Sequence, residues 1–376
     1  MTQVAYFSNQ FADAEGHGLA RYAREMYDGL HEVDGLTVTP VAAWSSQPMD
    51  DLSKLQSETG LELLPTGHRL TPFAWHYLGF PTIERLMRAP VDVVHAASLG
   101  YAIATRKPYV VTVHDLGPLT HPEYFTNTKP WIMEKALRQA EARADAIVCV
   151  SQSTADEVEG YLGGHVAPRL KVIKEGVSPH FFEPADMASI ASLDLPASDV
   201  PVILTAGKIS PRKNVQGVLN ALAQVASDVP HHLVLVGGAG WETEAVLDGM
   251  QNDALRNRVH LLDYVSDAQL RALYRRAAIY IHPSLYEGFG LTVLEAMASG
   301  VPVITSNTSS LPEVAGDAAM LVDPSDTEAI ADAIRALCLD PELAASKTTE
   351  GLARARLFSW TDCARELGLL LKDVSR

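Results

Sequence analysis

Residues 281–316, IHPSLYEGFGLTVLEAMASGVPVITSNTSSLPEVAG, predict a strand, a glycine turn, a short helix and a second strand, in that order. The first strand is expected at about 278–283 and the second at about 301–306. The helix between them is expected at about 290–299, because a glycine directly after it favours a left-handed stop. This pattern is typical of a parallel α/β sheet.

The turn in this stretch carries features of a binding site. Gly288 and Gly290 flank Phe289, and glycines allow the backbone to approach a ligand closely. Glu287 precedes the turn and Glu295 lies inside the helix. In open parallel sheets ligands bind beyond the carboxyl ends of the strands, and a helix N-terminus there favours an anion. The stretch therefore predicts a site for an anionic ligand with hydroxyl groups. A plain strand–helix–strand unit with solvated acids is the alternative.

Length and composition describe a globular chain of more than one domain. The chain has 376 residues, which favours two domains. Apolar residues make up 47% of it and charged residues 20%. The formal net charge is −16, which argues against nucleic acid as the main partner and against a strongly polybasic membrane anchor. A small local basic patch remains compatible with this charge.

The cysteines and the N-terminus point to a reducing compartment. Cys149, Cys338 and Cys363 show no metal-binding spacing, and Cys149 lies in an apolar strand. The first residues lack the basic region and long apolar run of a secretory signal. No stretch reaches the roughly 18 apolar residues of a membrane-spanning helix. We therefore expect a cytoplasmic protein.

Strands alternate with helices along the first half of the chain. This alternation predicts a doubly wound parallel sheet. The expected strands are 4–8, 37–43, 91–96, 109–113, 146–151 and 171–173.

Two places in this half have the character of ligand sites. Gly16 and Gly18 lie in a loop between a strand and a helix, where a phosphate would approach backbone N–H groups. Their spacing is not a dinucleotide fingerprint, so a plain tight turn is the alternative. His114 follows the strand 109–113 at the sheet edge where ligands bind. It is either a ligand contact or a structural histidine.

Residues 68–88, HRLTPFAWHYLGFPTIERLMR, mix arginines with aromatic residues. Phe73, Trp75, Tyr77 and Phe80 would form an amphipathic surface that touches lipid or a large acceptor. Core packing is the more common explanation for such aromatic residues.

The second half begins after a proline-rich linker at 178–201. Strand–helix alternation then resumes, with strands expected at 202–206, 232–236 and 259–262. The run GKISPRKN at 207–214 places Lys208 and Lys213 on a loop between a strand and a helix. Two ammonium groups beside a helix N-terminus would neutralise a diphosphate, whereas a solvated basic loop is the alternative.

Together these motifs resemble a known family. The run EGFGLTVLEAMASGVPVI, with seven residues between its two glutamates, is the most specific; SLPEVAGDAAMLVDPSD and GKISPRKN support it. The chain resembles the retaining, nucleotide-sugar-dependent glycosyltransferases of the GT-B fold, in glycosyltransferase family four (group 1). It departs from the family pattern at three positions. Lys208 stands where an arginine is usual, Asp263 where a glycine is common, and Glu175 where an asparagine often occurs.

The resemblance implies an α/β GT-B fold, in which two Rossmann-like doubly wound domains face a central cleft. The N-terminal, acceptor-side domain would comprise residues 1–177. The nucleotide-sugar-binding domain would comprise 178–359, and a C-terminal helix at about 360–376 would pack back on the first domain.

The resemblance also assigns roles to the second half of the site. Lys208 and Lys213 would hold the donor diphosphate and stabilise the leaving group. Glu287 would bind hydroxyls of the transferred sugar, and Glu295 would bind the ribose. The remaining substrate-binding positions implied there are Gly288, Phe289, Gly290, Leu291, Tyr264 and Val265.

In the first half, Gly16 and Gly18 would bring their loop over the phosphates, and His114 would touch the sugar near its reacting face. His114, Glu287, Lys208 and Lys213 are the implied catalytic residues. Two lysines and a helix N-terminus would neutralise the leaving group, so no metal or other cofactor is expected.

The expected reaction moves a sugar from a nucleotide-sugar donor to an acceptor hydroxyl with retention of configuration. The run TVHDLGPLTHPEYF, taken with the motifs above, resembles bacterial mannosyltransferases that build O-antigen or exopolysaccharide, which favours GDP-mannose. The acceptor would be a glycan or a lipid-linked saccharide, with peripheral contact at the inner membrane face. A UDP-hexose or UDP-N-acetylhexosamine donor, a nucleotide-sugar epimerase or hydrolase, and a non-catalytic binding protein are the alternatives.

Overall fold

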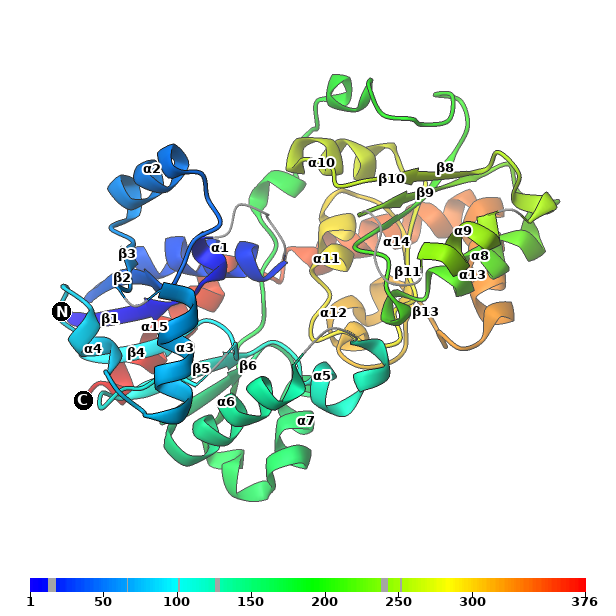
Figure 1. The fold of residues 1–376 in the computed structure, drawn as a ribbon. Coiled ribbons are helices and arrows are strands. Elements are labelled where there is room, and N and C mark those ends of the chain that lie inside the picture. Colours follow the sequence, from blue (N-terminus) through cyan, green and yellow to red (C-terminus); the bar gives the residue numbers. More distant parts are fainter. Residues whose placement is uncertain (13–17, 66, 101, 126–128, 238–242, 251) are drawn as a thin grey trace. The chain divides into compact units, whose positions relative to one another are not determined.

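The computed structural model describes residues 1–12, 18–65, 67–100, 102–125, 129–237, 243–250 and 252–376. The chain folds into two compact units (Figure 1). The first unit comprises Met1–Gly176 and Ser359–Arg376, and the second comprises Val177–Phe358. The chain therefore leaves the first unit, builds the second and returns. Each boundary lies one residue before the position expected from the sequence.

The first unit contains a parallel sheet of seven strands within the described residues, in the order β3-β2-β1-β4-β5-β6-β7. Its strands are β1 (Thr2–Phe7), β2 (Leu36–Ala42), β3 (Glu62–Leu63), β4 (Val93–Ala96), β5 (Tyr109–Val113), β6 (Ala146–Cys149) and β7 (Leu170–Val172). Its helices are α1 (Gly18–His31), α2 (Met49–Thr59), α3 (Gly67–Tyr77), α4 (Ile83–Leu86), α5 (Gly117–Thr120), α6 (Pro130–Arg143), α7 (Gln152–Leu162) and α15 (Trp360–Val374).

The second unit contains a parallel sheet of six strands within the described residues, in the order β10-β9-β8-β11-β12-β13. Its strands are β8 (Val202–Ala206), β9 (His232–Val236), β10 (Val259–Leu262), β11 (Ile279–His282), β12 (Val303–Ser306) and β13 (Met320–Val322). Its helices are α8 (Val215–Val225), α9 (Thr243–Met250), α10 (Asp267–Arg276), α11 (Leu291–Ala298), α12 (Leu311–Ala315), α13 (Thr327–Leu339) and α14 (Pro341–Ala355).

The central strands of both sheets are buried from end to end. Every residue of β5 and of β8 is buried, because helices cover both faces of each sheet. This explains why their sequences, YVVTV and VILTA, are nearly continuous apolar runs and do not alternate with polar residues. The doubly wound α/β architecture predicted from the sequence is confirmed in both units.

The C-terminal helix α15 is fixed on the first unit by close backbone approaches. Ser359 caps the helix by accepting a hydrogen bond from the amide of Asp362. A Cβ atom at Gly176 would lie 2.3 Å from the backbone nitrogen of Trp360. A Cβ atom at Gly29 of α1 would lie 2.5 Å from the Cβ of Ala364. Glycine is therefore required at both contacts.

The strands expected in the first half include none within residues 44–80, a stretch whose pattern is less regular than its neighbours. The segment contains α2, β3 and α3. The helix α2 has no buried residue, so it lacks the apolar stripe from which an amphipathic helix is recognised. The helices α12 and α14 and the short strand β13 were also not predicted.

Candidate active site

The residues of the opening stretch lie at a topological switch point of the second sheet. Strands β8 and β11 are neighbours, and the chain continues from β8 to β9 and β10 on one side and from β11 to β12 and β13 on the other. The loops that follow β8 and β11 therefore diverge at the carboxyl edge, where parallel sheets bind ligands.

These two loops are joined by hydrogen bonds through Arg212. The amide of Leu285 donates to the carbonyl oxygen of Arg212 at 2.7 Å. The hydroxyl of Ser284 donates to the same carbonyl at 2.7 Å. Asn214, in a left-handed conformation, begins α8 directly after this turn and donates to the carbonyl of Pro324 at 2.6 Å. The basic loop is therefore held against the turn that contains Glu287.

The carboxylate of Glu287 is the centre of the cluster. Its Oε1 lies 2.6 Å from Nζ of Lys213 and 2.5 Å from Nη1 of Arg212. The same oxygen accepts from Nε2 of His282 at 3.0 Å and lies 2.9 Å from the hydroxyl of Ser284, whose one proton is shared with the carbonyl of Arg212. Two cations and two neutral donors thus converge on one oxygen atom.

Burial and charge set the protonation states of this cluster. Burial alone would raise the pKa of Glu287, but Arg212 and Lys213 hold it well below its usual range. Burial lowers the pKa of Lys213 to about 8, although Glu287 acts in the opposite direction. Burial, with the charge of Lys213, lowers the pKa of His282 to about 4. His282 is therefore neutral near pH 7, with its Nε2 proton directed at Glu287.

The other oxygen of Glu287 is open. Among the described residues, no group donates to Oε2, whereas the amide of Glu287 donates to the hydroxyl of Ser309 at 3.1 Å. In the same part of the structure, the amides of Phe289 and Gly290 donate to no protein acceptor. A carboxylate oxygen and two N–H groups are thus left for a ligand at the start of α11.

Gly290 has a conformation that other residues rarely adopt. Its φ is +121°, and a Cβ atom there would lie 2.8 Å from Cδ2 of Leu311. The carbonyl oxygens of Glu287 and Phe289 both accept from the hydroxyl of Ser310. The turn is therefore fixed by Ser310, and glycine is required where it enters α11.

Glu295 lies deeper than Glu287. It is buried inside α11, and its Oε2 accepts from the hydroxyl of Tyr274 at 3.1 Å. Its charge acts on the pKa of Lys213, so the two groups belong to one electrostatic cluster. Its role as a ribose ligand stays a prediction.

The remaining predicted residues of the second unit differ in exposure. Lys208 and Tyr264 are exposed, whereas Val265 and Phe289 are buried. Gly207 has a φ of +130°, and a Cβ atom there would lie 3.2 Å from Cε of Lys213. The turn at Gly207 therefore passes beside the side chain of Lys213. Lys208 is the residue that follows Gly207 in the chain.

In the first unit, His114 lies just after β5 and is almost fully enclosed. Its ring forms hydrogen bonds to Glu175 and to the carbonyl of Ala97, the residue that follows β4. The hydroxyl-bearing ring of Tyr22 meets it edge to face at 4.5 Å. Both ring nitrogens are thus engaged within this unit. Gly18 is the first residue of α1, and Gly16 lies outside the described residues.

Sequence reasoning missed three members of the Glu287 cluster. Arg212 lies within GKISPRKN, but only the two lysines of that run were selected. His282 is the last residue of β11 and Ser284 follows it by two residues, and their position at a carboxyl edge was the available signal. Within the described part of the chain, no group of three or more His, Cys, Asp or Glu side chains could hold a metal ion.

Comparison with known proteins identifies the family. Residues 194–351 match the model described as glycosyl transferases group 1, and residues 16–181 match that of glycosyltransferase family 4. O-antigen chain mannosyltransferase B of Escherichia coli is 34% identical over 270 residues, which cover 68% of each chain. Alpha-maltose-1-phosphate synthase of Mycolicibacterium smegmatis is 29% identical, covering 75% of this chain and 76% of its own.

Solved structures show the same fold. Sucrose-phosphate synthase from Thermosynechococcus elongatus superposes with a TM-score of 0.74 at 22% identity, covering 100% of this chain and 99% of its own. An Anabaena protein solved with UDP and glucose gives 0.76 at 17% identity, covering 99% and 100%. The chain therefore belongs to the group 1 and family 4 glycosyltransferases, hexosyltransferases of the GT-B fold.

Proposed function

We propose that this glycosyltransferase moves mannose from GDP-mannose to a hydroxyl of a glycan or lipid-linked saccharide, with retention of anomeric configuration. The observation that carries the proposal is the carboxylate of Glu287. One of its oxygens is held by Lys213, Arg212, His282 and Ser284, and the other is open. A carboxylate fixed in this way is suited to accept hydrogen bonds from two sugar hydroxyls without moving.

The cations of the basic loop suit the leaving group. The bond that breaks joins the anomeric carbon to the donor diphosphate, and negative charge develops on the diphosphate as it leaves. Lys213 and Arg212, with Lys208 beside them in the chain, offer positive charge there, and the amides of Phe289 and Gly290 offer further donors. Preorganised donors of this kind stabilise a transition state because they need no reorganisation.

The new bond joins the anomeric carbon to the acceptor oxygen on the same face. The acceptor proton passes to an oxygen of the departing diphosphate, so that charge and atoms balance without an enzymic nucleophile. Each unit by itself supports this route, because in the second unit Glu287 is occupied by cations and in the first unit His114 has both nitrogens engaged. Neither residue is placed as an unencumbered base.

The choice of mannose is supported by relatives and not by the geometry. The E. coli relative at 34% identity is a mannosyltransferase by name, and so is serotype-specific mannosyltransferase WbdA, 31% identical over 264 residues. The solved Anabaena relative holds UDP and glucose, which favours a UDP-hexose as the second candidate. These relatives also motivate polysaccharide synthesis as the setting, without requiring it.

A donor panel tests the proposal. The purified protein is incubated with GDP-mannose, GDP-glucose, UDP-glucose and UDP-N-acetylglucosamine, and release of nucleoside diphosphate is followed with and without short mannose-containing acceptors. GDP-mannose is expected to give the highest acceptor-dependent rate, and NMR of the product is expected to show the donor's anomeric configuration. Turnover with a UDP-sugar but not with GDP-mannose would refute the donor assignment. An inverted product would refute the retaining mechanism.

A further inference from the structure

A cluster of large apolar side chains is exposed on the first unit. Phe73 and Tyr77 of α3 are 58% and 61% exposed, Phe80 of the following loop is 52% exposed, and Trp131 of α6 is 52% exposed. Leu70 and Leu78 are exposed beside them. Single exposed apolar residues are ordinary, but a contiguous group marks an interaction site.

Ring contacts show that the group is contiguous. The rings of Phe73 and Tyr77 lie 4.8 Å apart, as expected for positions four apart on one helix face. The rings of His76 and Trp131 lie 5.2 Å apart and join α3 to α6. The buried Trp75 donates to the carbonyl of Pro81 at 2.6 Å and so holds the loop with Phe80 against α3. We call these six exposed apolar residues the aromatic patch.

The structure thus separates the two interpretations of residues 68–88. Trp75 packs in the core, in edge contact with Phe7 at 5.5 Å, as the common explanation expects. Phe73, Tyr77 and Phe80 do not pack in the core, because their side chains are exposed.

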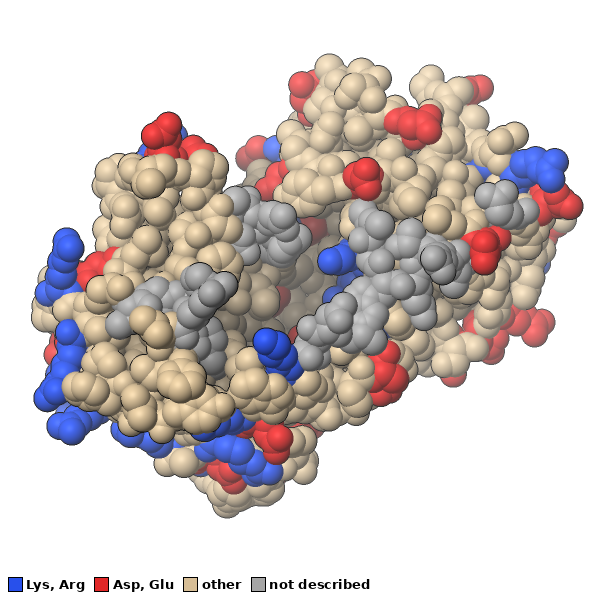
Figure 2. Space-filling view, viewed as in Figure 1, with Lys and Arg blue, Asp and Glu red and all other residues tan. Residues whose placement is uncertain are grey.

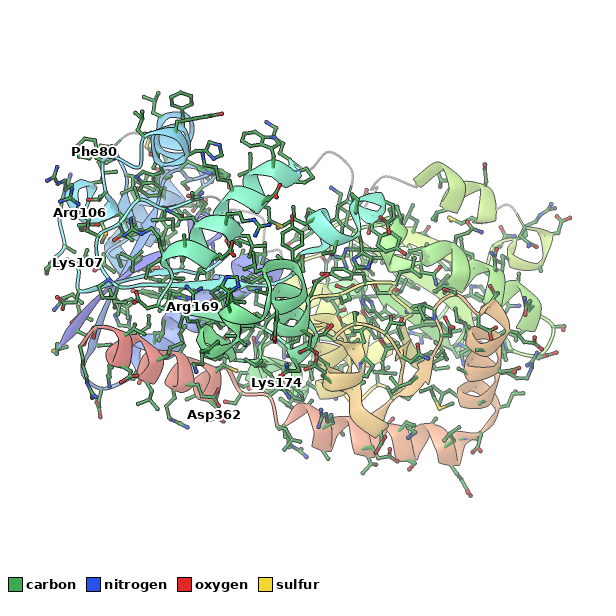
Figure 3. All side chains as sticks on the ribbon, turned by 90° about the horizontal axis from the view of Figure 1, so that it is seen from below. Phe80, Arg106, Lys107, Arg169, Lys174 and Asp362 are labelled. Carbon is green, nitrogen blue, oxygen red and sulfur yellow. The ribbon has the colours of Figure 1, made fainter. Side chains whose placement is uncertain are left out.

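Cations lie over two rings of the aromatic patch. The guanidinium of Arg85 lies 5.4 Å from the centre of the Phe80 ring, and the ammonium of Lys135 lies 5.0 Å from that of Tyr77. Arg88 and Lys129 are exposed and lie close in the chain to Arg85 and Trp131. Arg106 and Lys107 are also exposed, and the amide of Arg106 donates to Glu84 of α4. Figure 3 shows Phe80, Arg106 and Lys107 along one outer edge of the first unit. Figure 2 shows Lys and Arg gathered on the side of this unit that carries α4.

Two acids of this edge, Glu84 and Glu62, are turned onto the protein. Glu84 accepts from the hydroxyl of Thr105 at 3.0 Å and from the amide of Arg106 at 2.9 Å. Glu62 accepts from the amides of Arg88 and Ala89. In the described part of the chain, none of the six cations named above forms an ion pair with a carboxylate. Positive charge is thus concentrated here in a chain whose net charge is −16.

We infer that the aromatic patch and its cations dock on an anionic lipid bilayer. Aromatic rings are suited to the interface between head groups and acyl chains, and cations beside them are suited to anionic head groups. A protein partner would need a shaped, complementary surface, whereas exposed aromatic side chains with cations beside them need only a fluid one. The inference stands on these residues alone and does not depend on the donor or the stereochemistry proposed above.

Vesicle sedimentation tests the inference with the whole chain. Wild-type protein is expected to bind vesicles of phosphatidylcholine and phosphatidylglycerol in equal parts at least about tenfold more tightly than vesicles of phosphatidylcholine alone. This difference is expected to shrink in high salt, because salt screens surface charge. Trp131 fluorescence is expected to shift to shorter wavelength on binding, and the shift is expected to disappear in Trp131→Phe.

Two double variants separate the charge from the apolar contribution. Arg85→Glu with Arg106→Glu is expected to weaken binding to the anionic vesicles at least about tenfold. Phe73→Ser with Tyr77→Ser is expected to weaken it by a similar factor while leaving its salt dependence in place. Leu357→Ser and Arg256→Glu remove equally exposed groups of the second unit and are expected to bind like wild type.

Three results would overturn the inference: no vesicle binding, equal binding to both vesicle types, or wild-type binding in both double variants. A fourth would reassign the surface: if vesicles do not bind but the double variants raise the KM for a soluble glycan acceptor, the aromatic patch is an acceptor site. Nucleoside diphosphate release with a soluble acceptor and no vesicles is expected to be unchanged in all variants. If GDP-mannose is not turned over in the donor panel, the vesicle result still stands, because the two experiments test different residues.

Discussion

Nδ1 of His114 lies 2.9 Å from Oε1 of Glu175, and Nε2 of the same ring lies 2.9 Å from the carbonyl oxygen of Ala97. Neither acceptor carries a hydrogen, so both ring nitrogens must donate to satisfy both contacts. Burial alone would lower the His114 pKa, but the hydrogen bond and charge of Glu175 raise it above its ordinary value. The environment of His114 therefore favours the imidazolium form, which has no lone pair to act as a base.

Replacing Glu175 by glutamine is expected to change stability in a pH-dependent way. The folded-state pKa of His114 is raised, so its contribution to stability is complete below the unfolded value and lost as pH rises through the folded value. Below about pH 6.5, Glu175→Gln is expected to cost about 3 kcal/mol, because it removes one partner of a buried pair. Above the folded-state pKa of His114, the difference in unfolding free energy between Glu175→Gln and wild type is expected to become smaller.

Thermal unfolding across this pH range, with NMR of the histidine rings, measures this effect. Glu58→Gln is the matched control, because Glu58 is an exposed acid of the same unit. A His114 resonance that titrates alike in wild type and Glu175→Gln would contradict the imidazolium assignment. The sequence marks Glu175 as unusual, because it stands where the family often has asparagine.

Glu287 is expected to be the most sensitive single position for turnover. Glu287→Gln keeps a hydrogen-bond acceptor but removes the charge that fixes Lys213 and Arg212. We expect kcat to fall by about 10² to 10³, the loss typical of removing one preorganised group from a site. Nucleoside diphosphate release measures it, and Glu328→Gln, an exposed acid in the first turn of α13, is the control. Near-wild-type turnover in Glu287→Gln would refute the site.

The arrangement around Glu287 was only partly predictable from sequence. The glycine turn, Glu287 and the basic run were visible because each follows a strand at its carboxyl end. Glu295 was visible because seven residues separate it from Glu287. His282 and Ser284 were not selected, because a histidine and a serine at a strand end are common. Their role depends on the distance between two loops, and spacing along the chain does not encode it.

Strand positions were predicted more accurately than helices. The strands β5, β8, β9 and β10 have the predicted bounds. For β5 and β8 the reason is that buried central strands are continuous apolar runs set off by glycine and polar residues. The helices α2 and α3 were missed, because α2 buries nothing and α3 exposes Leu70, Phe73 and Tyr77. A helix whose apolar residues face solvent violates the pattern by which helices are recognised, and such violations are expected at functional surfaces.

Lys213 is expected to set an alkaline limit on activity. Burial lowers its pKa in the free protein to about 8, so above that pH the amine loses the charge that would meet the diphosphate. We expect kcat/KM to decline above about pH 8, since this ratio reports the free enzyme. Lys213→Arg is expected to flatten that decline while lowering the maximum, because the guanidinium stays charged but is larger.

A pH profile of initial rates at low donor concentration tests this expectation. Lys208→Ala is the matched comparison. Lys208 is proposed to neutralise the same diphosphate, but its side chain is exposed and that of Lys213 is largely buried. We expect it to raise the KM for the donor while keeping the alkaline decline of wild type. A decline that persists unchanged in Lys213→Arg would show that another group titrates.

Gly176 and Gly160 provide a matched pair for the stability of the first unit. At Gly176 a Cβ atom would lie 2.3 Å from the backbone nitrogen of Trp360 and 2.8 Å from the carbonyl carbon of Ser359, so α15 would have to move. At Gly160, within α7, a Cβ atom would meet nothing within 4 Å. Gly176→Ala is therefore expected to destabilise by about 3 kcal/mol or more, since backbone cannot yield as a side chain does. Gly160→Ala is expected to stabilise by up to about 1 kcal/mol, because alanine favours the helix. Calorimetric unfolding measures both variants. Equal melting temperatures for them would contradict the close packing of α15 on the first unit, which is what completes that unit around His114 and Glu175.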